Sequence, residues 1–324
     1  MPRRRLVVLG ALAVAVSAVA QAAYKAPRTS WGDPDLEGVY ANDNEYATPL
    51  ERPDEFKGKT LADVTPAELA EVRRQATEKM IANLAPGPRG PDQWWLENLD
   101  LAKRAQPWLI VDPADGKVPA LTAEGKSRVG PRVRSSFVGG PFDSPEDFNP
   151  LERCISRGLP GSMIPVMYGN VYQIAQSPGY VVITYEIVHE ARVIPLDGRS
   201  HVGGAIHEHM GDARGHWEGD TLVIETTNFT TLTVYRNANP ARLKITERYT
   251  PVARNRIAWT ATMDDPTTWA APWTIAMPLT LDPQPAMAFE CHEGNYGLRN
   301  ILSAARAADA AHAATPAQSS AAPK

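Results

Sequence analysis

The chain has 324 residues, which is enough to bury a full hydrophobic core in one large or two ordinary domains. Its 33 Lys and Arg residues against 37 Asp and Glu residues give a formal net charge of −4 without a basic run, so the composition gives no support for nucleic-acid binding. No phosphate loop, dinucleotide-binding fingerprint or Gly-x-Ser-x-Gly elbow occurs, which argues against the common kinase, dehydrogenase and hydrolase classes.

The N-terminus has the pattern of a secretory signal. Three arginines at positions 3–5 precede an apolar run over 6–19, and Ala20-Gln21-Ala22 forms a small-x-small cleavage site. The apolar run is too short for a stable membrane span, and no other segment approaches that length. We therefore expect a signal peptide over residues 1–22, export to the periplasm or beyond, and no integral membrane segment after cleavage. The arginines leave both the general and the twin-arginine export routes open.

Residues 23–150 are predicted to form an N-terminal extension. A turn leads into a candidate strand over residues 36–40. Thr65, Pro66 and Glu68 have the pattern of a capped helix start, which predicts a helix over about 66–84. From residue 85 the composition shifts to Pro, Gly and charge with large aromatics, so we expect this part to wrap or plug a scaffold, or to serve as a lid.

From residue 163 the sequence consists of short apolar segments joined by tight turns. The candidate strands are Met163–Tyr168, Val171–Gln176, Tyr180–Val188, Ala191–Leu196, His216–Trp217, Thr221–Thr226, Leu243–Thr250, Arg256–Met263, Trp273–Leu279 and Ala286–Glu290. This pattern predicts a mainly β fold: an antiparallel, up-and-down, lipocalin-like barrel over residues 151–302, with a sandwich as the alternative. Such a barrel is wide enough to hold one small ligand. A short helix is expected over 300–312, and the Ala-rich tail over 303–324 is predicted to be disordered.

The two cysteines, Cys154 and Cys291, are the only ones in the chain. In an exported protein this even count favours one disulfide over two free thiols. In the chain-entropy model, a disulfide that closes a loop of that size stabilises the folded chain by roughly 4–5 kcal/mol.

The first candidate catalytic residue, Glu186, lies on the predicted strand Tyr180–Val188. Tyr185 and Glu186 point to opposite faces, and if the face of Glu186 lines the barrel, desolvation raises the pKa of this carboxyl into the range of a general acid or base. Otherwise Glu186 is a solvated surface residue. Arg192 is expected to fix a carboxylate, to bind a substrate oxyanion, or to form a structural ion pair.

A histidine-rich stretch follows. His207 and His209 have an H-x-H spacing, and Asp212 or His216 is a possible further ligand for a metal ion; the alternative is a polar loop at the barrel mouth. In the hairpin over 214–229, Arg214 and His216 share a face opposite to Trp217. Asn228 follows the hairpin, as a polar ligand or a turn cap.

A second polar cluster surrounds Cys291. If the disulfide forms, His292 and Glu293 are held beside the scaffold as a candidate acid–base pair, with Asn295 as a neighbouring polar group. The alternative is a loop held together by side-chain hydrogen bonds.

Several segments together resemble a large group of secreted, uncharacterised bacterial proteins. The segments are PDLEGVY (34–40), TPLERP (48–53), RCISRGLP (153–160), IPLDGR (194–199), GDARGHWEGDTLVIETTNF (211–229), DDPTTW (264–269) and ECHEGNYGLRNIL (290–302). The resemblance implies a lipocalin-like barrel with N-terminal decoration, and it implies no established reaction.

These observations lead to three functional hypotheses. The first is an exported enzyme without a cofactor that binds a small, mostly apolar molecule in the barrel and performs lyase, hydratase or isomerase chemistry. Its candidate catalytic residues are His292, His216, Glu186, Glu293, Arg192 and Arg214, and its candidate binding residues are Trp217, Asn228, Asn295 and Tyr185. The second is a non-catalytic carrier on the same barrel, and the third is a metal-dependent oxygenase or hydrolase built on His207, His209 and Asp212. The oligomeric state is left open.

Overall fold

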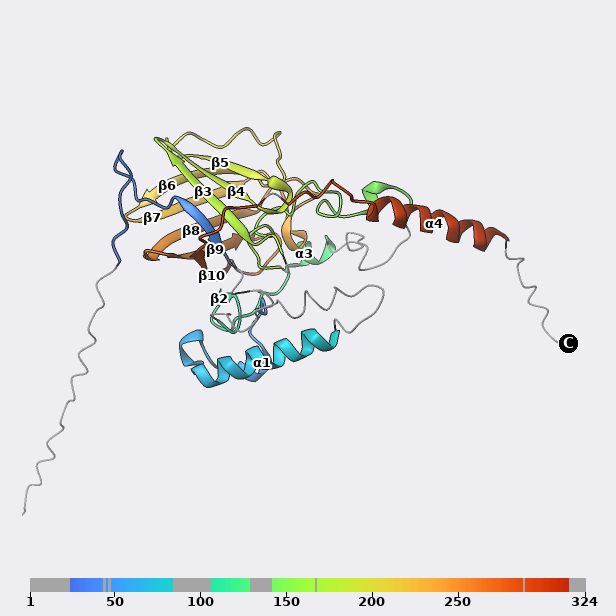
Figure 1. The fold of residues 1–324 in the computed structure, drawn as a ribbon, viewed down its shortest axis with the longest axis horizontal. Coiled ribbons are helices and arrows are strands. Elements are labelled where there is room, and N and C mark those ends of the chain that lie inside the picture. Colours follow the sequence, from blue (N-terminus) through green and yellow to red (C-terminus); the bar gives the residue numbers. More distant parts are fainter. Residues whose placement is uncertain are drawn as a thin grey trace, which may run out of the picture.

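The computed structural model describes residues 24–42, 45, 48–83, 106–128, 142–166, 168–287 and 289–314. Within them, nine strands form a nearly closed antiparallel barrel, which confirms the predicted mainly β, up-and-down architecture (Figure 1). The expected signal peptide and the end of the tail lie outside the described residues, as does much of the stretch expected to wrap the barrel.

Each strand of the barrel pairs with its spatial neighbours. In spatial order the strands are β5 (Ala191–Pro195), β4 (Tyr180–Tyr185), β3 (Val171–Ser177), β1 (Gly38–Ala41), β10 (Trp273–Leu281), β9 (Arg256–Asp264), β8 (Lys244–Ala253), β7 (Thr221–Thr227) and β6 (Asp212–Glu218). A short strand, β2 (Ile110–Asp112), pairs with β10 outside this order.

The helices lie outside the barrel. They are α1 (Pro66–Asn83), α3 (Ala123–Ser127) and α4 (Gly297–Ala314), and α4 projects from the barrel near the C-terminus (Figure 1). The start of α1 confirms the predicted cap, because Thr65 Oγ1 accepts from the Glu68 backbone N–H while Glu68 Oε2 accepts from the Thr65 N–H. α4 confirms the helix expected over 300–312, and it overlaps the first part of the tail that was expected to be disordered from residue 303. No described helix is both long enough and apolar enough to cross a membrane.

The N-terminal extension contributes one barrel strand. In β1, which falls in the expected strand region, Tyr40 pairs with Tyr172 of β3 and with Leu281 of β10. The barrel therefore includes residues 38–41 and is not confined to the predicted range of 151–302.

Alternation along the strands fills the barrel with side chains. On β4, Val181, Ile183 and Tyr185 are buried, and on β9 Trp259 and Met263 are fully buried. These residues belong to one continuous core that includes side chains from all nine barrel strands. Because neighbouring residues of a strand face opposite sides, the intervening positions of β4 and β9 face outward.

β5 and β6 are the two end strands of the sheet, and they meet where the barrel closes; we call this line of contact the seam. Gly215 of β6 lies against β5, and a Cβ atom at this position would come within 2.7 Å of Leu196 Cδ2 and 2.9 Å of Ile194 Cγ2. Only glycine lets the two strands approach this closely.

A turn over residues 158–163 packs into the core. The Ser162 N–H donates to the Gly158 carbonyl and the Met163 N–H donates to the Pro160 carbonyl, both at 2.8 Å. The strand predicted at Met163–Tyr168 is wrong, because this turn and Pro165, which has no N–H, prevent a ladder. The strand predicted at Ala286–Glu290 is also absent from the described residues of that segment.

Candidate functional site

A group of polar side chains lies inside the barrel, and we call it the lumenal cluster. Its members come from five strands and are at most 3% exposed: Arg192 of β5, Tyr185 of β4, Thr226 of β7, Glu247 and Tyr249 of β8, and Trp259 of β9. They lie among the aliphatic and aromatic side chains of the core.

An ion pair is the centre of the lumenal cluster. Arg192 Nη1 lies 2.6 Å from Glu247 Oε2 and donates to the Tyr185 hydroxyl at 3.0 Å. Glu247 Oε1 accepts from the Tyr249 hydroxyl at 2.9 Å and from Trp259 Nε1 at 3.2 Å. The three side chains around the carboxylate and the guanidinium therefore join the ion pair in one connected polar network in a low-dielectric interior.

The network determines the charge states of its members. Burial favours the neutral form of Arg192, but the Glu247 carboxylate and the Tyr185 hydroxyl outweigh it, so the pKa of Arg192 is raised and the side chain is charged. Burial also raises the pKa of Tyr185 and, further reinforced by the Glu247 charge, that of Tyr249. Both phenols are therefore protonated at neutral pH and act as hydrogen-bond donors or neutral acids.

The ion pair also bridges the seam. Arg192 projects from β5, one end strand, and its Nη2 donates to Thr226 Oγ1 of β7 at 3.0 Å while Nη1 pairs with Glu247 of β8. Both partners lie beyond β6, the other end strand. The pair thus links the two ends of the sheet where no backbone ladder joins them, which is a structural role in closing the barrel.

Two buried atoms of the pair have no hydrogen-bond partner within the described part of the chain. These are Arg192 Nε and Glu247 Oε2, the latter in ionic contact with Arg192 only. The nearby Met163 carbonyl accepts from Tyr172 at 3.0 Å, and Met163 Sδ lies 3.9 Å from the Tyr249 hydroxyl. A buried base, two neutral phenols and a cation are the chemical components of an acid–base site.

A second candidate site is an open groove beside the disulfide, and we call it the disulfide groove. Its volume is about 420 Å³. It is lined by Phe148, Leu151, Glu152, Tyr168, Ile187, Phe289, Glu290, Cys291, Glu293, Gly294, Asn295, Gly297, Leu298 and Ile301. Tyr168 and Phe289 face one another with ring centroids 5.4 Å apart, and Leu298 and Ile301 come from the first turns of α4. The groove falls in the size range of small-molecule sites and has a mostly apolar wall.

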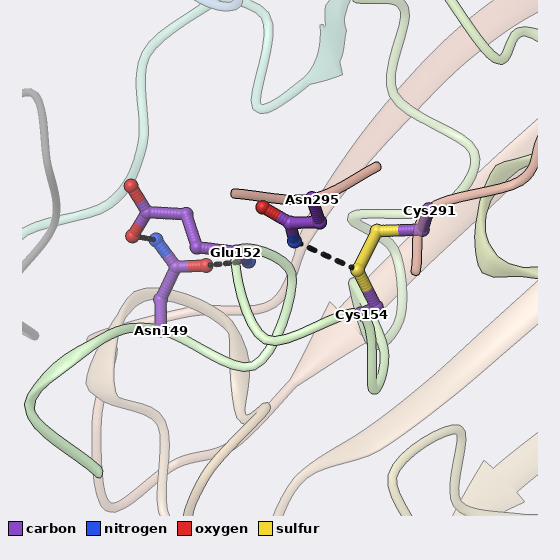
Figure 2. Close-up of a disulfide and its surroundings, with 5 residues drawn as sticks. All are labelled: Asn149, Glu152, Cys154, Cys291 and Asn295. Carbon is purple, nitrogen blue, oxygen red and sulfur yellow. Dashed lines mark hydrogen bonds between the residues drawn. A yellow bond between two sulfur atoms is a disulfide. The ribbon is translucent and has the colours of Figure 1, made fainter. Parts of the chain in front are cut away.

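The disulfide between Cys154 and Cys291 confirms the predicted pairing and joins the two segments that line this groove. Figure 2 shows Asn295 beside the bridge, where its Nδ2 donates to Cys154 Sγ at 3.5 Å. In the same view Asn149 Nδ2 donates to Glu152 Oε2 at 2.6 Å, which orients this carboxylate. The bridge therefore fixes the loop after β10 against the segment before β3.

Only part of the predicted polar cluster around Cys291 lies in the groove. Glu293 and Asn295 line the groove, whereas the side chain of His292 is exposed and makes no hydrogen bond or ion pair within the described residues. His292 and Glu293 are adjacent in the sequence, but no hydrogen bond or ion pair joins their side chains in the described structure.

Three other predicted catalytic residues lie outside the barrel. Glu186 is half-buried at the end of β4, on the face opposite to the buried one, and accepts from the Val171 N–H at 3.2 Å. His216 is exposed on β6 and pairs with Glu218 at 3.2 Å. Arg214 shares the outer face of His216. Strand alternation directs His216 and Arg214 away from the lumen, which is the outward alternative for their hairpin. Glu186 follows the last residue of β4, so the three groups do not converge in the lumen.

Two of the predicted binding residues, Trp217 and Asn228, have contacts that stabilise the fold. Trp217 packs against the core with its Nε1 buried and unpaired, so it is the inward residue of its hairpin. Asn228 adopts a positive φ of 59° and donates through Nδ2 to the Val202 carbonyl at 3.0 Å, which makes it the turn residue among the two alternatives.

Asp212 anchors the histidine-rich loop to β6. Burial opposes ionisation, but the Val202 N–H, His201 and Arg214 all hydrogen-bond to the carboxylate, and the net effect lowers the pKa of Asp212. The ionised form is therefore the one that stabilises the fold.

We expect the stabilisation from Asp212 to disappear in acid. A carboxyl with a lowered folded pKa contributes stability above its unfolded pKa of about 3.9, and the contribution is lost as pH falls through the folded value. The difference in unfolding free energy between wild type and Asp212→Asn should be about 2 kcal/mol at pH 7 and should shrink below about pH 4. Urea unfolding at several pH values measures this. Asp264→Asn is the control, since the Asp264 carboxylate has no partner in the described chain, and a pH-independent difference for Asp212→Asn would refute the account.

The residues proposed for a metal do not converge. His207 Nδ1 contacts the Phe229 carbonyl at 3.1 Å, His209 Nδ1 contacts Thr230 Oγ1 at 3.4 Å, and Asp212 is engaged as described. Within the described residues, no group of three or more His, Cys, Asp or Glu side chains is arranged to hold a metal ion.

Glu247 and Tyr249 are functional candidates that were not predicted from the sequence. A signal was present, since both share strand parity with Ile245, while Lys244, Thr246 and Arg248 form the polar outer face. A lone carboxylate on the apolar face of a strand indicates a buried partner, here Arg192. For the groove, the sequence indicated only the disulfide with Glu293 and Asn295, because the rest of the wall comes from segments far apart in the sequence.

Comparisons of this chain with protein-family models, with curated proteins and with solved structures found no match.

Proposed function

We propose that this chain is an exported protein that binds a small, mostly apolar molecule in the disulfide groove. The observation that carries the proposal is an open groove of about 420 Å³ with an aromatic pair, Tyr168 and Phe289, on its wall. Exposed apolar surface that is concave and backed by a rigid scaffold is the usual form of a ligand site. Export is supported by the N-terminal sequence pattern and by the disulfide, which persists in oxidising compartments.

A disulfide and an exposed ion pair connect the segments that form the groove. Cys154 and Cys291 hold one wall, and Arg306 of α4 pairs with Asp143 at 2.9 Å, which ties the helix that forms the other wall to the segment before the groove. A wall that is ordered before binding reduces the entropic cost of association.

A neutral fluorescent probe tests this function. N-phenylnaphthylamine should gain fluorescence with the oxidised wild-type protein in a saturable manner. Leu298→Trp, which places a large ring in the groove, should weaken binding by at least tenfold. Asn300→Trp is the matched control, because Asn300 is an exposed position on the same helix. Equal binding by all three proteins would refute the groove as the site.

A second candidate function is acid–base catalysis in the lumen, of the lyase, hydratase or isomerase type. The observation that favours it is the pair of buried atoms without hydrogen bonds, Arg192 Nε and Glu247 Oε2, beside two neutral phenols. Glu247 would serve as the base, Tyr249 as the acid, and Arg192 would stabilise a developing anion. A substrate would occupy space now filled by side chains such as Met163.

Mass spectrometry of periplasmic extract incubated with purified protein tests this candidate. Turnover by the wild-type protein that is lost in Tyr249→Phe would support it. Unchanged metabolites with the wild type, or equal turnover by Tyr249→Phe, would count against it.

A further inference from the structure

We propose that the ligand of the disulfide groove is a small organic cation with an apolar body, such as an aryl or alkyl quaternary ammonium compound. This inference rests on the proposed function and specifies its ligand class.

The charged residues that line the groove all carry the same sign. They are Glu152, Glu290 and Glu293, and no Lys, Arg or His occurs among the lining residues that the structure describes. Glu290 and Glu293 form no ion pair within the described part of the chain, so their charge is not neutralised by a neighbouring side chain. An apolar anion entering the groove would meet like charge on its rim, whereas a cation would gain Coulomb attraction in a partly desolvated site.

The aromatic pair adds a second source of attraction. Tyr168 is 49% exposed, and its ring and that of Phe289 are tilted by 31° with centroids 5.4 Å apart. The face of an aromatic ring attracts a cation that lies within about 6 Å of its centroid. Carboxylates around an aromatic wall are the combination that recognises quaternary ammonium groups.

The apolar part of the groove wall is the reason for inferring an apolar body in the ligand. Leu151, Leu298 and Ile301 also line the groove, and their side chains contain no polar atoms. A bare inorganic cation would leave this surface exposed to water. The groove therefore fits a molecule with a charged end and an apolar body rather than a metal ion.

Three ligands of one shape distinguish the charge classes. They are benzyltrimethylammonium, the neutral alcohol benzyl dimethyl carbinol, and the anion benzylsulfonate, each titrated by displacement of N-phenylnaphthylamine from the oxidised wild-type protein. We expect the cation to displace the probe at a concentration about tenfold lower than the alcohol, and the anion to be weakest. The preference should diminish at 1 M salt, where screening is strong.

Matched variants test the origin of the preference. Glu290→Gln/Glu293→Gln should reduce the affinity for the cation to that of the alcohol while leaving the alcohol unchanged. Glu55→Gln/Glu208→Gln, which removes the same charge at exposed positions outside the groove, should leave the preference intact. Tyr168→Leu should reduce the affinity for the cation by about threefold and leave the affinity for the alcohol unchanged.

The outcomes separate this inference from the proposed function. If the probe binds but the three ligands displace it equally well, or the anion displaces it best, the inference is overturned and the groove is still a binding site. No binding of the probe overturns both. Dimerisation of the wild type that Leu298→Trp abolishes, measured by sedimentation, would assign the groove to a second copy of the chain and overturn the inference as well.

Discussion

Replacing Arg192 by methionine is expected to lower the free energy of unfolding by about 3–5 kcal/mol. The substitution leaves the Glu247 carboxylate, whose side chain is fully buried, without its ionic partner. It also removes the link from β5 to Thr226 across the seam, where no backbone ladder joins the end strands. Urea unfolding followed by tryptophan fluorescence measures the loss, because Trp259 belongs to the same cluster.

Two further variants show whether the loss arises from an unpaired charge. Arg192→Met/Glu247→Leu should recover most of the stability, since apolar residues of similar volume replace both charges. Arg248→Met, on the outer face of β8, removes an exposed pair with Glu218 and should cost less than about 1 kcal/mol. A loss below about 1 kcal/mol for Arg192→Met would mean that the pair does not hold the barrel closed.

Removing the disulfide is the second change with a large expected effect. Cys154→Ser/Cys291→Ser should lower the free energy of unfolding by roughly 4–5 kcal/mol, because the bridge closes a loop of 137 residues in the unfolded chain. The variant should also bind N-phenylnaphthylamine more weakly, since Cys291 lies in the groove wall.

Reduction of the wild-type protein provides the control for this variant. The reduced wild type should match the double variant in both stability and probe affinity, while Arg192→Met should retain normal affinity, because the lumenal cluster does not line the groove. A double variant with unchanged stability would contradict the role of the bridge, and unchanged probe affinity would contradict its role in shaping the groove.

The sequence predicted the repeated hairpins well, because period-two alternation and turn residues are local signals. The same signals were misleading where a strand depends on distant partners. Met163–Tyr168 has strand composition, but it belongs to a turn and a proline-containing segment. Conversely, β6 is longer than predicted, since Gly215 lowers strand propensity locally but is required by the approach of β5 at the seam.

The sites were harder to predict than the fold. The sequence identified Arg192 and Tyr185 as candidates, but it did not reveal that their partner is Glu247, because the registers of β5 and β8 around a closed barrel are not encoded locally. It also gave weight to His216, whose place on the outer face depends on which side of β6 packs inward. Histidine density alone was therefore a poor guide to a site.

Methyl NMR spectra recorded during a titration with benzyltrimethylammonium test the central claim most directly. We expect shifts for the methyl groups of Ile187, Leu298 and Ile301 in the groove and none for Ile224 and Ile245 in the barrel core. Shifts confined to the core methyl groups would place the ligand in the lumen and contradict the account.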